Sequence, residues 1–141
     1  MGFTKVRGSC LCGGIEYEVE ISDKRILNCY CTRCQKAHGA AFATMAFAKG
    51  ETLRFLKGES MLHEYKTASG SRSFCGECGS RLMNFAPNKA DYLGISLSCV
   101  DGDAGVGPVA SISIETKAPW VEIPADPPSY EGMPHRIPET E

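Results

Sequence analysis

The sequence predicts a mainly β, single-domain protein that holds metal ions. Short segments in which apolar and polar residues alternate are separated by glycine-rich turns, the pattern of a β protein. Eight cysteines fall largely into C-x-C and C-x-x-C spacings, which are typical of zinc ligation. A chain of 141 residues is long enough to bury one hydrophobic core.

Individual elements follow from this alternation. Apolar residues alternate with glutamates over residues 15–21, the period of a half-buried strand, and residues 22–24 are predicted to turn. After Cys34 we expect one or two helical turns that stop at Gly39. Further strands are predicted at 25–28, 40–47, 52–56, 62–65, 81–85, 92–100 and 109–114, and residues 68–71 are expected to form a loop before the C-x-x-C pair.

The C-terminal region differs in composition from the rest of the chain. Six of the eight prolines lie from Pro119 onward, and proline resists both helices and central strands. We therefore predict a zinc-binding domain over residues 1–118 and an extended Pro-rich tail over 119–141 that packs on the domain or trails from it. Trp120 and Tyr130 are expected to attach the tail by burying aromatic surface.

Charge and hydropathy exclude several classes of protein. The formal net charge is −2 and the basic residues are spread along the chain, which argues against nucleic-acid binding. No apolar run approaches the roughly 20 residues of a membrane span. Residues 1–7 lack the apolar core of a signal peptide, so we expect a cytoplasmic protein whose cysteines are not paired in disulfides.

The cysteine spacing predicts two zinc ions per chain. A C-x-C pair and a C-x-x-C pair, each followed by glycine, would together form a closed structural site from Cys10, Cys12, Cys75 and Cys78. Cys29, Cys31 and Cys34 remain as a second set with only three ligands. An open fourth position distinguishes a catalytic zinc from a structural one, so we assign the catalytic role to these three residues.

Several alternatives stay open at this point. Cys99 or His38 could complete the three-cysteine site and make it structural, although a buried inert thiol is the simpler role for Cys99. The C-x-x-C pair could be a redox dithiol, but it lacks a clear βαβ context. The three closely spaced cysteines could hold an iron–sulfur cluster, but they match no ferredoxin spacing.

The order of these motifs resembles the glutathione-dependent formaldehyde-activating enzyme family, to which centromere protein V also belongs. The resemblance rests on Gly8-Ser9-Cys10-x-Cys12-Gly13-Gly14, Cys29-x-Cys31-x-x-Cys34-Gln35-Lys36 and Phe74-Cys75-Gly76-x-Cys78-Gly79-Ser80. It implies a β-tent fold with two zinc ions held by the two sets above. It also implies that glutathione adds to formaldehyde to give S-hydroxymethylglutathione, formally a carbon–sulfur lyase acting in reverse.

The residues suggest how such a reaction would run. The zinc at the three cysteines would take a substrate thiol as its fourth ligand and deprotonate it. Arg33, Lys36 and Arg72 lie near the cysteines in sequence and could bind the carboxylates of a peptide thiol. The partners would then be a thiol such as glutathione and a small aldehyde. The alternative is a zinc-stabilised module that binds protein and has no chemistry.

Overall fold

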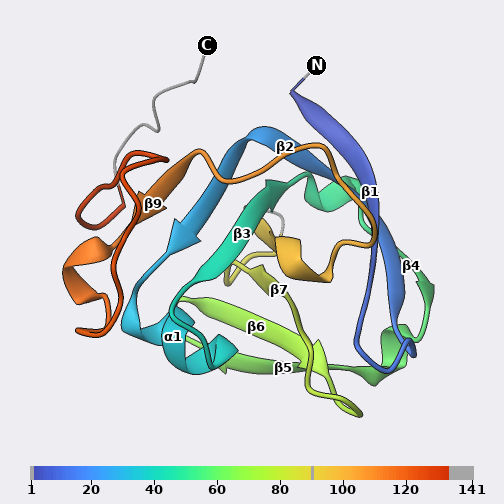
Figure 1. The fold of residues 1–141 in the computed structure, drawn as a ribbon. Helices are drawn as coiled ribbons and strands as arrows, with labels where there is room; N and C mark the ends of the chain where they lie inside the picture. Colours follow the sequence, from blue (N-terminus) through green and yellow to red (C-terminus); the bar gives the residue numbers. More distant parts are fainter. Residues whose placement is uncertain (1, 90, 134–141) are drawn as a thin grey trace.

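The computed structural model describes residues 2–89 and 91–133, and its fold is mainly β, as predicted (Figure 1). One open, bent sheet has the order β1-β2-β3-β8-β7-β6-β5, and both β4 and β9 pair with β2. Neighbouring strands are antiparallel except β9, which runs parallel to β2. The strands are β1 (Phe3–Ser9), β2 (Glu16–Cys29), β3 (Ala43–Ala48), β4 (Arg54–Lys57), β5 (Leu62–Thr67), β6 (Gly70–Cys75), β7 (Arg81–Phe85), β8 (Leu93–Ser96) and β9 (Ala110–Ile112).

Helical structure among the described residues is limited to α1 (Thr32–His38) and four single 3₁₀ turns, η1 (Gly50–Thr52), η2 (Glu59–Met61), η3 (Leu97–Cys99) and η4 (Ile114–Thr116). The helix follows Cys29 and Cys31 and stops at Gly39, whose φ of 59° is left-handed. The predicted helical turns and their stop are therefore confirmed. No helix in the described part of the chain is long and apolar enough to cross a membrane.

The long strand β2 organises the sheet and carries much of the core. Ile15, just before it, and Tyr17 and Ile21 within it are fully buried, which confirms the predicted alternation over residues 15–21. They pack with buried side chains of the other strands, among them Ile26, Ala46, Leu82, Met83, Leu93 and Ile95. Core packing therefore holds the N-terminal half of β2 in place, and Cys29 lies at the C-terminal end of the same strand.

The predicted turn at 22–24 is wrong, because β2 continues through it. Ser22 Oγ accepts hydrogen bonds from the backbone amides of Lys24 and Arg25, a local arrangement typical of turns. Pairing with β1 reaches Ser22, and the register with β3 shifts between Ile21 and Ile26. The irregularity is thus absorbed as a bulge, which bends the strand instead of reversing it.

Two further strand boundaries differ from the prediction. Strand β1 was not expected, since residues 3–9 show no strict alternation, yet it pairs with β2 from Phe3↔Ser22 to Ser9↔Glu16. The segment predicted as a strand over 92–100 leaves the sheet after Ser96 and forms η3. The alternation of apolar residues can continue from a strand into the turn that follows it, so this pattern does not show where the strand ends.

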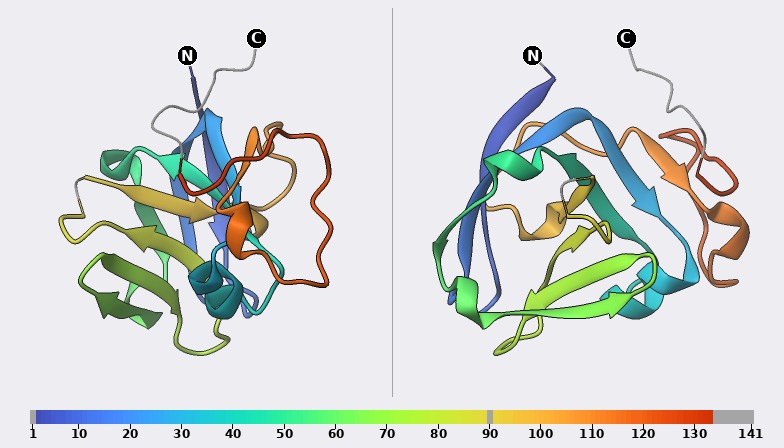
Figure 2. Two further views of the ribbon diagram at one scale, coloured as in Figure 1. Left: turned by 90° about the vertical axis from the view of Figure 1, so that its left-hand side faces the viewer. Right: turned by 180° about the vertical axis from the view of Figure 1, so that it is seen from behind.

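The described part of the Pro-rich region is attached through its backbone. Ser111 N donates to Pro128 O over 2.9 Å, and Tyr130 N donates to Ser111 O over 2.8 Å, so residues 128–130 extend the sheet beside β9. Figure 2 shows the red region that follows η4 looping outward from the body of the protein. Trp120 is 75% exposed, so the expectation that its side chain attaches the tail is wrong.

Gly58 offers a test of the packing around the loop before β2. Its φ is +74°, and an added Cβ would lie within van der Waals overlap of the Gly14 carbonyl oxygen. We expect Gly58→Ala to destabilise the fold by roughly 3 kcal/mol or more, because steric overlap adds to the cost of positive φ. Gly105→Ala is the matched control: its φ is +74° with nothing within 4 Å, so urea unfolding should show only about 1–2 kcal/mol of loss. Equal losses in the two variants would contradict the packing.

Candidate metal centres

Cys10, Cys12, Cys75 and Cys78 form a four-cysteine cluster whose sulfurs all lie within 4.8 Å of one another. The first pair sits on the loop between β1 and β2, and the second pair lies at the end of β6 and in the turn that follows. Cys10 Sγ lies 3.5 Å from Cys12 Sγ, which in turn lies 3.9 Å from Cys75 Sγ. The structure thus brings together two loops that are 63 residues apart in sequence.

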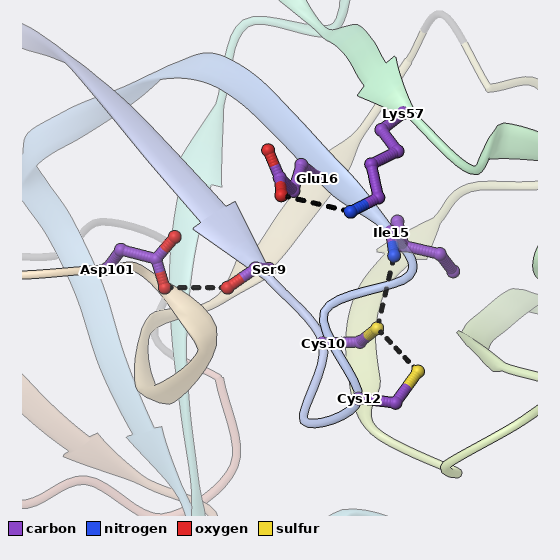
Figure 3. A network of polar contacts seen from close by, with 7 residues as sticks. All are labelled: Ser9, Cys10, Cys12, Ile15, Glu16, Lys57 and Asp101. Carbon is purple, nitrogen blue, oxygen red and sulfur yellow. Dashed lines mark hydrogen bonds and ion pairs between the residues drawn. The ribbon is translucent and has the colours of Figure 1, made fainter.

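Tight backbone turns at glycine hold the cysteines of both loops in place. Gly13 N donates to Cys10 O and Gly79 N donates to Cys75 O, and both glycines have positive φ, which a side chain would disfavour. Ile15 N also donates to Cys10 Sγ over 3.3 Å (Figure 3). Figure 3 further shows polar contacts of Ser9 and Glu16, the residues that flank this loop.

The four-cysteine cluster fits a tetrahedral zinc ion. Zinc–sulfur bonds of about 2.3 Å place the sulfurs of a tetrahedral site about 3.8 Å apart. The separations of 3.5 and 3.9 Å bracket that value. Ser80 Oγ lies 3.3 Å from Cys78 Sγ, and this hydrogen bond lowers the pKa of Cys78 to about 5, so a thiolate is available at neutral pH.

Cys29, Cys31 and Cys34 form a separate three-cysteine cluster, also within 4.8 Å of one another. Cys29 ends β2, Cys31 is the N-cap of α1, and Cys34 lies in the first turn of the helix. Cys34 N donates to Cys31 Sγ over 3.3 Å, so the capping interaction itself points the sulfur toward Cys34. The chain therefore turns from β2 into α1 between Cys29 and Cys34 and brings the three sulfurs together.

Hydrogen bonds from the helix side and from the sheet side hold this bend. Gln35 Nε2 donates to Tyr30 O over 2.7 Å and to Thr116 O over 2.9 Å. Tyr30 N donates to Ile112 O, which ties the same peptide to β9. The backbone between Cys29 and Cys31 is thus fixed from the helix and from the sheet.

Negative charge within the three-cysteine cluster is concentrated on Cys34. Hydrogen bonding with Cys29 lowers the pKa of Cys34 to about 5, and the neighbouring Arg72 guanidinium adds to this effect. The same interaction raises the pKa of Cys29, which keeps that proton. Arg72 Nη2 lies 3.9 Å from Cys34 Sγ. The Cys34 thiolate can therefore bind a cation, and the Arg72 guanidinium lies next to its negative charge.

No fourth Cys, His, Asp or Glu joins the three-cysteine cluster among residues 2–89 and 91–133. Cys99 lies elsewhere: its Sγ donates to Arg81 O over 3.3 Å, and burial raises its pKa to about 11. His38 lines a neighbouring hollow of about 810 Å³ together with Cys78 and Cys99. Burial and the charges of Arg72 and Arg81 lower the pKa of His38.

A cleft of about 850 Å³ opens beside the three-cysteine cluster. It lies between α1, the β5–β6 hairpin and β7, and α1 lies next to this hairpin in the views of Figures 1 and 2. Four of its lining side chains are cationic, namely Arg33, Lys36, Arg72 and Arg81. We call it the cationic cleft. Arg72 lines this cleft and also contacts Cys34 Sγ.

Sequence reasoning singled out three of these cations and missed other lining residues. Arg81 comes from β7, and Tyr65 and Tyr92 supply aromatic surface to the same cleft. Burial raises the pKa of Tyr92, and the charges of Cys34 and Cys29 add to that shift. Only the position of Arg81 close after the C-x-x-C pair was a signal in the sequence, since the sheet's curvature creates the other contacts.

Fold and site together define a β protein with a four-cysteine cluster and a separate three-cysteine cluster, the latter beside a cationic cleft. The sequence matches the family described as glutathione-dependent formaldehyde-activating enzyme over residues 5–116. The chain therefore belongs to this family, and the resemblance identified from its motifs is confirmed.

Among solved structures, a crystal structure of a Rhodobacter sphaeroides protein, a structural genomics target, is similar to the chain with a TM-score of 0.57. The two are 26% identical, and the match covers 69% of this chain and 89% of the other. A comparison with curated proteins finds no match.

Proposed function

We propose that this protein is a zinc-dependent enzyme that adds the thiol of glutathione, or of a similar molecule, to formaldehyde, giving S-hydroxymethylglutathione. Family membership supports activation of formaldehyde with glutathione in general. The observation that carries the finer proposal is the three-cysteine cluster, which has no fourth ligand among the described Cys, His, Asp and Glu residues and borders a cationic cleft.

The two clusters have separate roles in this proposal. Cys10, Cys12, Cys75 and Cys78 would hold a structural zinc, and Cys29, Cys31 and Cys34 a catalytic one. A zinc ion held by these three residues would supply Lewis-acid chemistry, which lowers the pKa of an incoming thiol. Lining residues on α1 and β7 (Arg33, Lys36 and Arg81) would bind the carboxylates of that thiol.

The bond changes are balanced without any further reactant. The substrate sulfur forms a bond to the carbonyl carbon of formaldehyde, the π electrons of the carbonyl move to its oxygen, and that oxygen receives the proton given up by the thiol. Tyr92 lines the cleft, and its raised pKa keeps the phenol protonated at neutral pH. It would donate a hydrogen bond to the developing oxyanion.

Exchange spectroscopy on mixtures of glutathione and formaldehyde tests the reaction. These reactants interconvert with their adduct without an enzyme, so the quantity measured is the increase in exchange rate per mole of protein. We expect zinc-loaded protein to accelerate both adduct formation and adduct breakdown, because a catalyst leaves the equilibrium constant unchanged. No acceleration by protein that carries both metals would contradict the proposed reaction while leaving the fold unaffected.

A further inference from the structure

The cationic cleft has a charge pattern that constrains what it binds. Arg33 and Lys36 come from α1, Arg72 from β6 and Arg81 from β7. The rest of its described lining is neutral and contains no Asp or Glu. A ligand entering this space therefore meets positive charge from several directions and no fixed carboxylate.

Local contacts hold several of these cations in place. Arg33 Nη1 donates to Ser69 Oγ over 3.3 Å, across from α1 to the β5–β6 hairpin. The Arg81 guanidinium lies 4.8 Å from the centre of the Phe74 ring. Neither contact neutralises charge, so both side chains keep their full positive charge for a ligand.

The carboxylate of Glu64, next in sequence to the cleft residue Tyr65, already has a cationic partner. Glu64 of β5 pairs with Lys89 Nζ over 3.0 Å, and it does not line the cleft, whereas the adjacent Tyr65 does. Successive side chains of a strand point to opposite faces, which explains this separation. Three thiolates and one zinc ion would carry a net charge of −1. The Arg72 guanidinium, next to Cys34 Sγ, would balance this charge. Three cations remain for the ligand.

From this excess of positive charge we propose that the cleft selects an acidic thiol through at least two anionic groups and provides no site for an ammonium group. This inference rests on the proposed function, which it sharpens. Glutathione has two carboxylates and one ammonium group, so its carboxylates fit the cleft and its ammonium does not. A thiol of similar size with the acidic groups and without the ammonium is the preferred substrate.

Binding of unreactive analogues to zinc-loaded protein tests recognition apart from chemistry. S-methylglutathione is the reference, its N-acetyl derivative lacks the ammonium charge, and its dimethyl ester lacks both carboxylate charges. By calorimetry we expect the N-acetyl derivative to bind roughly two- to fivefold more tightly, the size of one partly screened charge contact. The diester should bind roughly tenfold more weakly or worse, because charge-assisted hydrogen bonds are lost.

Variants that remove two of the cleft cations test whether these charges cause the difference in affinity. Arg33→Gln combined with Lys36→Gln should weaken binding of the N-acetyl derivative and remove most of its advantage over the reference. Lys57→Gln is the matched control, since Lys57 pairs with Glu16 and does not line the cleft. It should leave all three affinities unchanged.

The outcomes separate the two proposals. Weaker binding of the N-acetyl derivative than of the reference would overturn the inference, as would equal binding of the diester or no binding of any analogue. If the affinities follow the expected order but neither glutathione nor N-acetylglutathione exchanges faster with formaldehyde, the proposed reaction fails and acidic recognition stands.

Discussion

Replacing Cys34 with serine should remove one of two zinc ions and lower the acceleration of glutathione–formaldehyde exchange by roughly 100-fold or more. A metal site with three protein ligands loses much of its affinity when one thiolate is removed, and the proposed chemistry requires that metal. Cys34 is also the ligand next to Arg72, so its loss leaves the cationic side chain without its counter-charge. Metal content and exchange rate are measured on the same preparation.

Cys99→Ser is the control for Cys34→Ser. Cys99 is half-buried and lies outside both cysteine clusters of the described residues, and its thiol donates a hydrogen bond to the Arg81 carbonyl oxygen. A serine hydroxyl can donate the same hydrogen bond, so both zinc ions and the exchange rate should stay close to wild type. If Cys34→Ser retained both metals and the wild-type rate, the catalytic assignment of the three-cysteine cluster would be wrong.

Replacing Cys75 with serine should have its main effect on stability. This fully buried residue lies at the end of β6 next to the loop that carries Cys10 and Cys12, so a metal bound by the four cysteines would close a long segment of chain. Metal binding at such sites contributes folding free energy directly, and we expect a loss on the order of 5 kcal/mol. Urea unfolding and zinc content report the effect.

The stability effect should distinguish the two clusters. Cys29, Cys31 and Cys34 lie within six residues of one another, so a metal there restrains little additional chain, and Cys34→Ser should destabilise the fold less than Cys75→Ser. Chelation of the wild-type protein gives an independent check, because it leaves every side chain in place. A Cys75→Ser variant that loses a zinc ion and keeps its urea midpoint would contradict a structural role for the four-cysteine cluster.

Local cysteine spacing was sufficient to predict both clusters. A C-x-C or C-x-x-C pair with a following glycine determines the geometry of its own loop. Joining Cys10 and Cys12 with Cys75 and Cys78 was the most economical way to complete four ligands, and the structure brings these four sulfurs together. The helical turns that stop at Gly39 were predictable for the same reason, since a left-handed glycine ends a helix within one turn. These features depend on residues close in sequence.

Features that depend on the curvature of the sheet could not be predicted. Tyr92 and Tyr65 lie far from the three-cysteine cluster in sequence, and only the order β3-β8-β7-β6-β5 brings them to one cleft beside α1. The bulge after Ile21 has the same origin: Ser22 forms turn-like hydrogen bonds, but pairing on both sides keeps the chain extended. Long-range pairing overrides local preference in both cases.

The most direct test of the open site is X-ray absorption at the zinc edge, together with metal counting, on protein with and without added glutathione. We expect two zinc ions per chain, one with four sulfur neighbours and the other with three, and an increase in average sulfur coordination when glutathione binds. The contrary result is a second zinc with a fourth protein ligand, nitrogen or sulfur, whose coordination does not change with glutathione. It would contradict the proposed enzyme and favour a zinc-stabilised binding module.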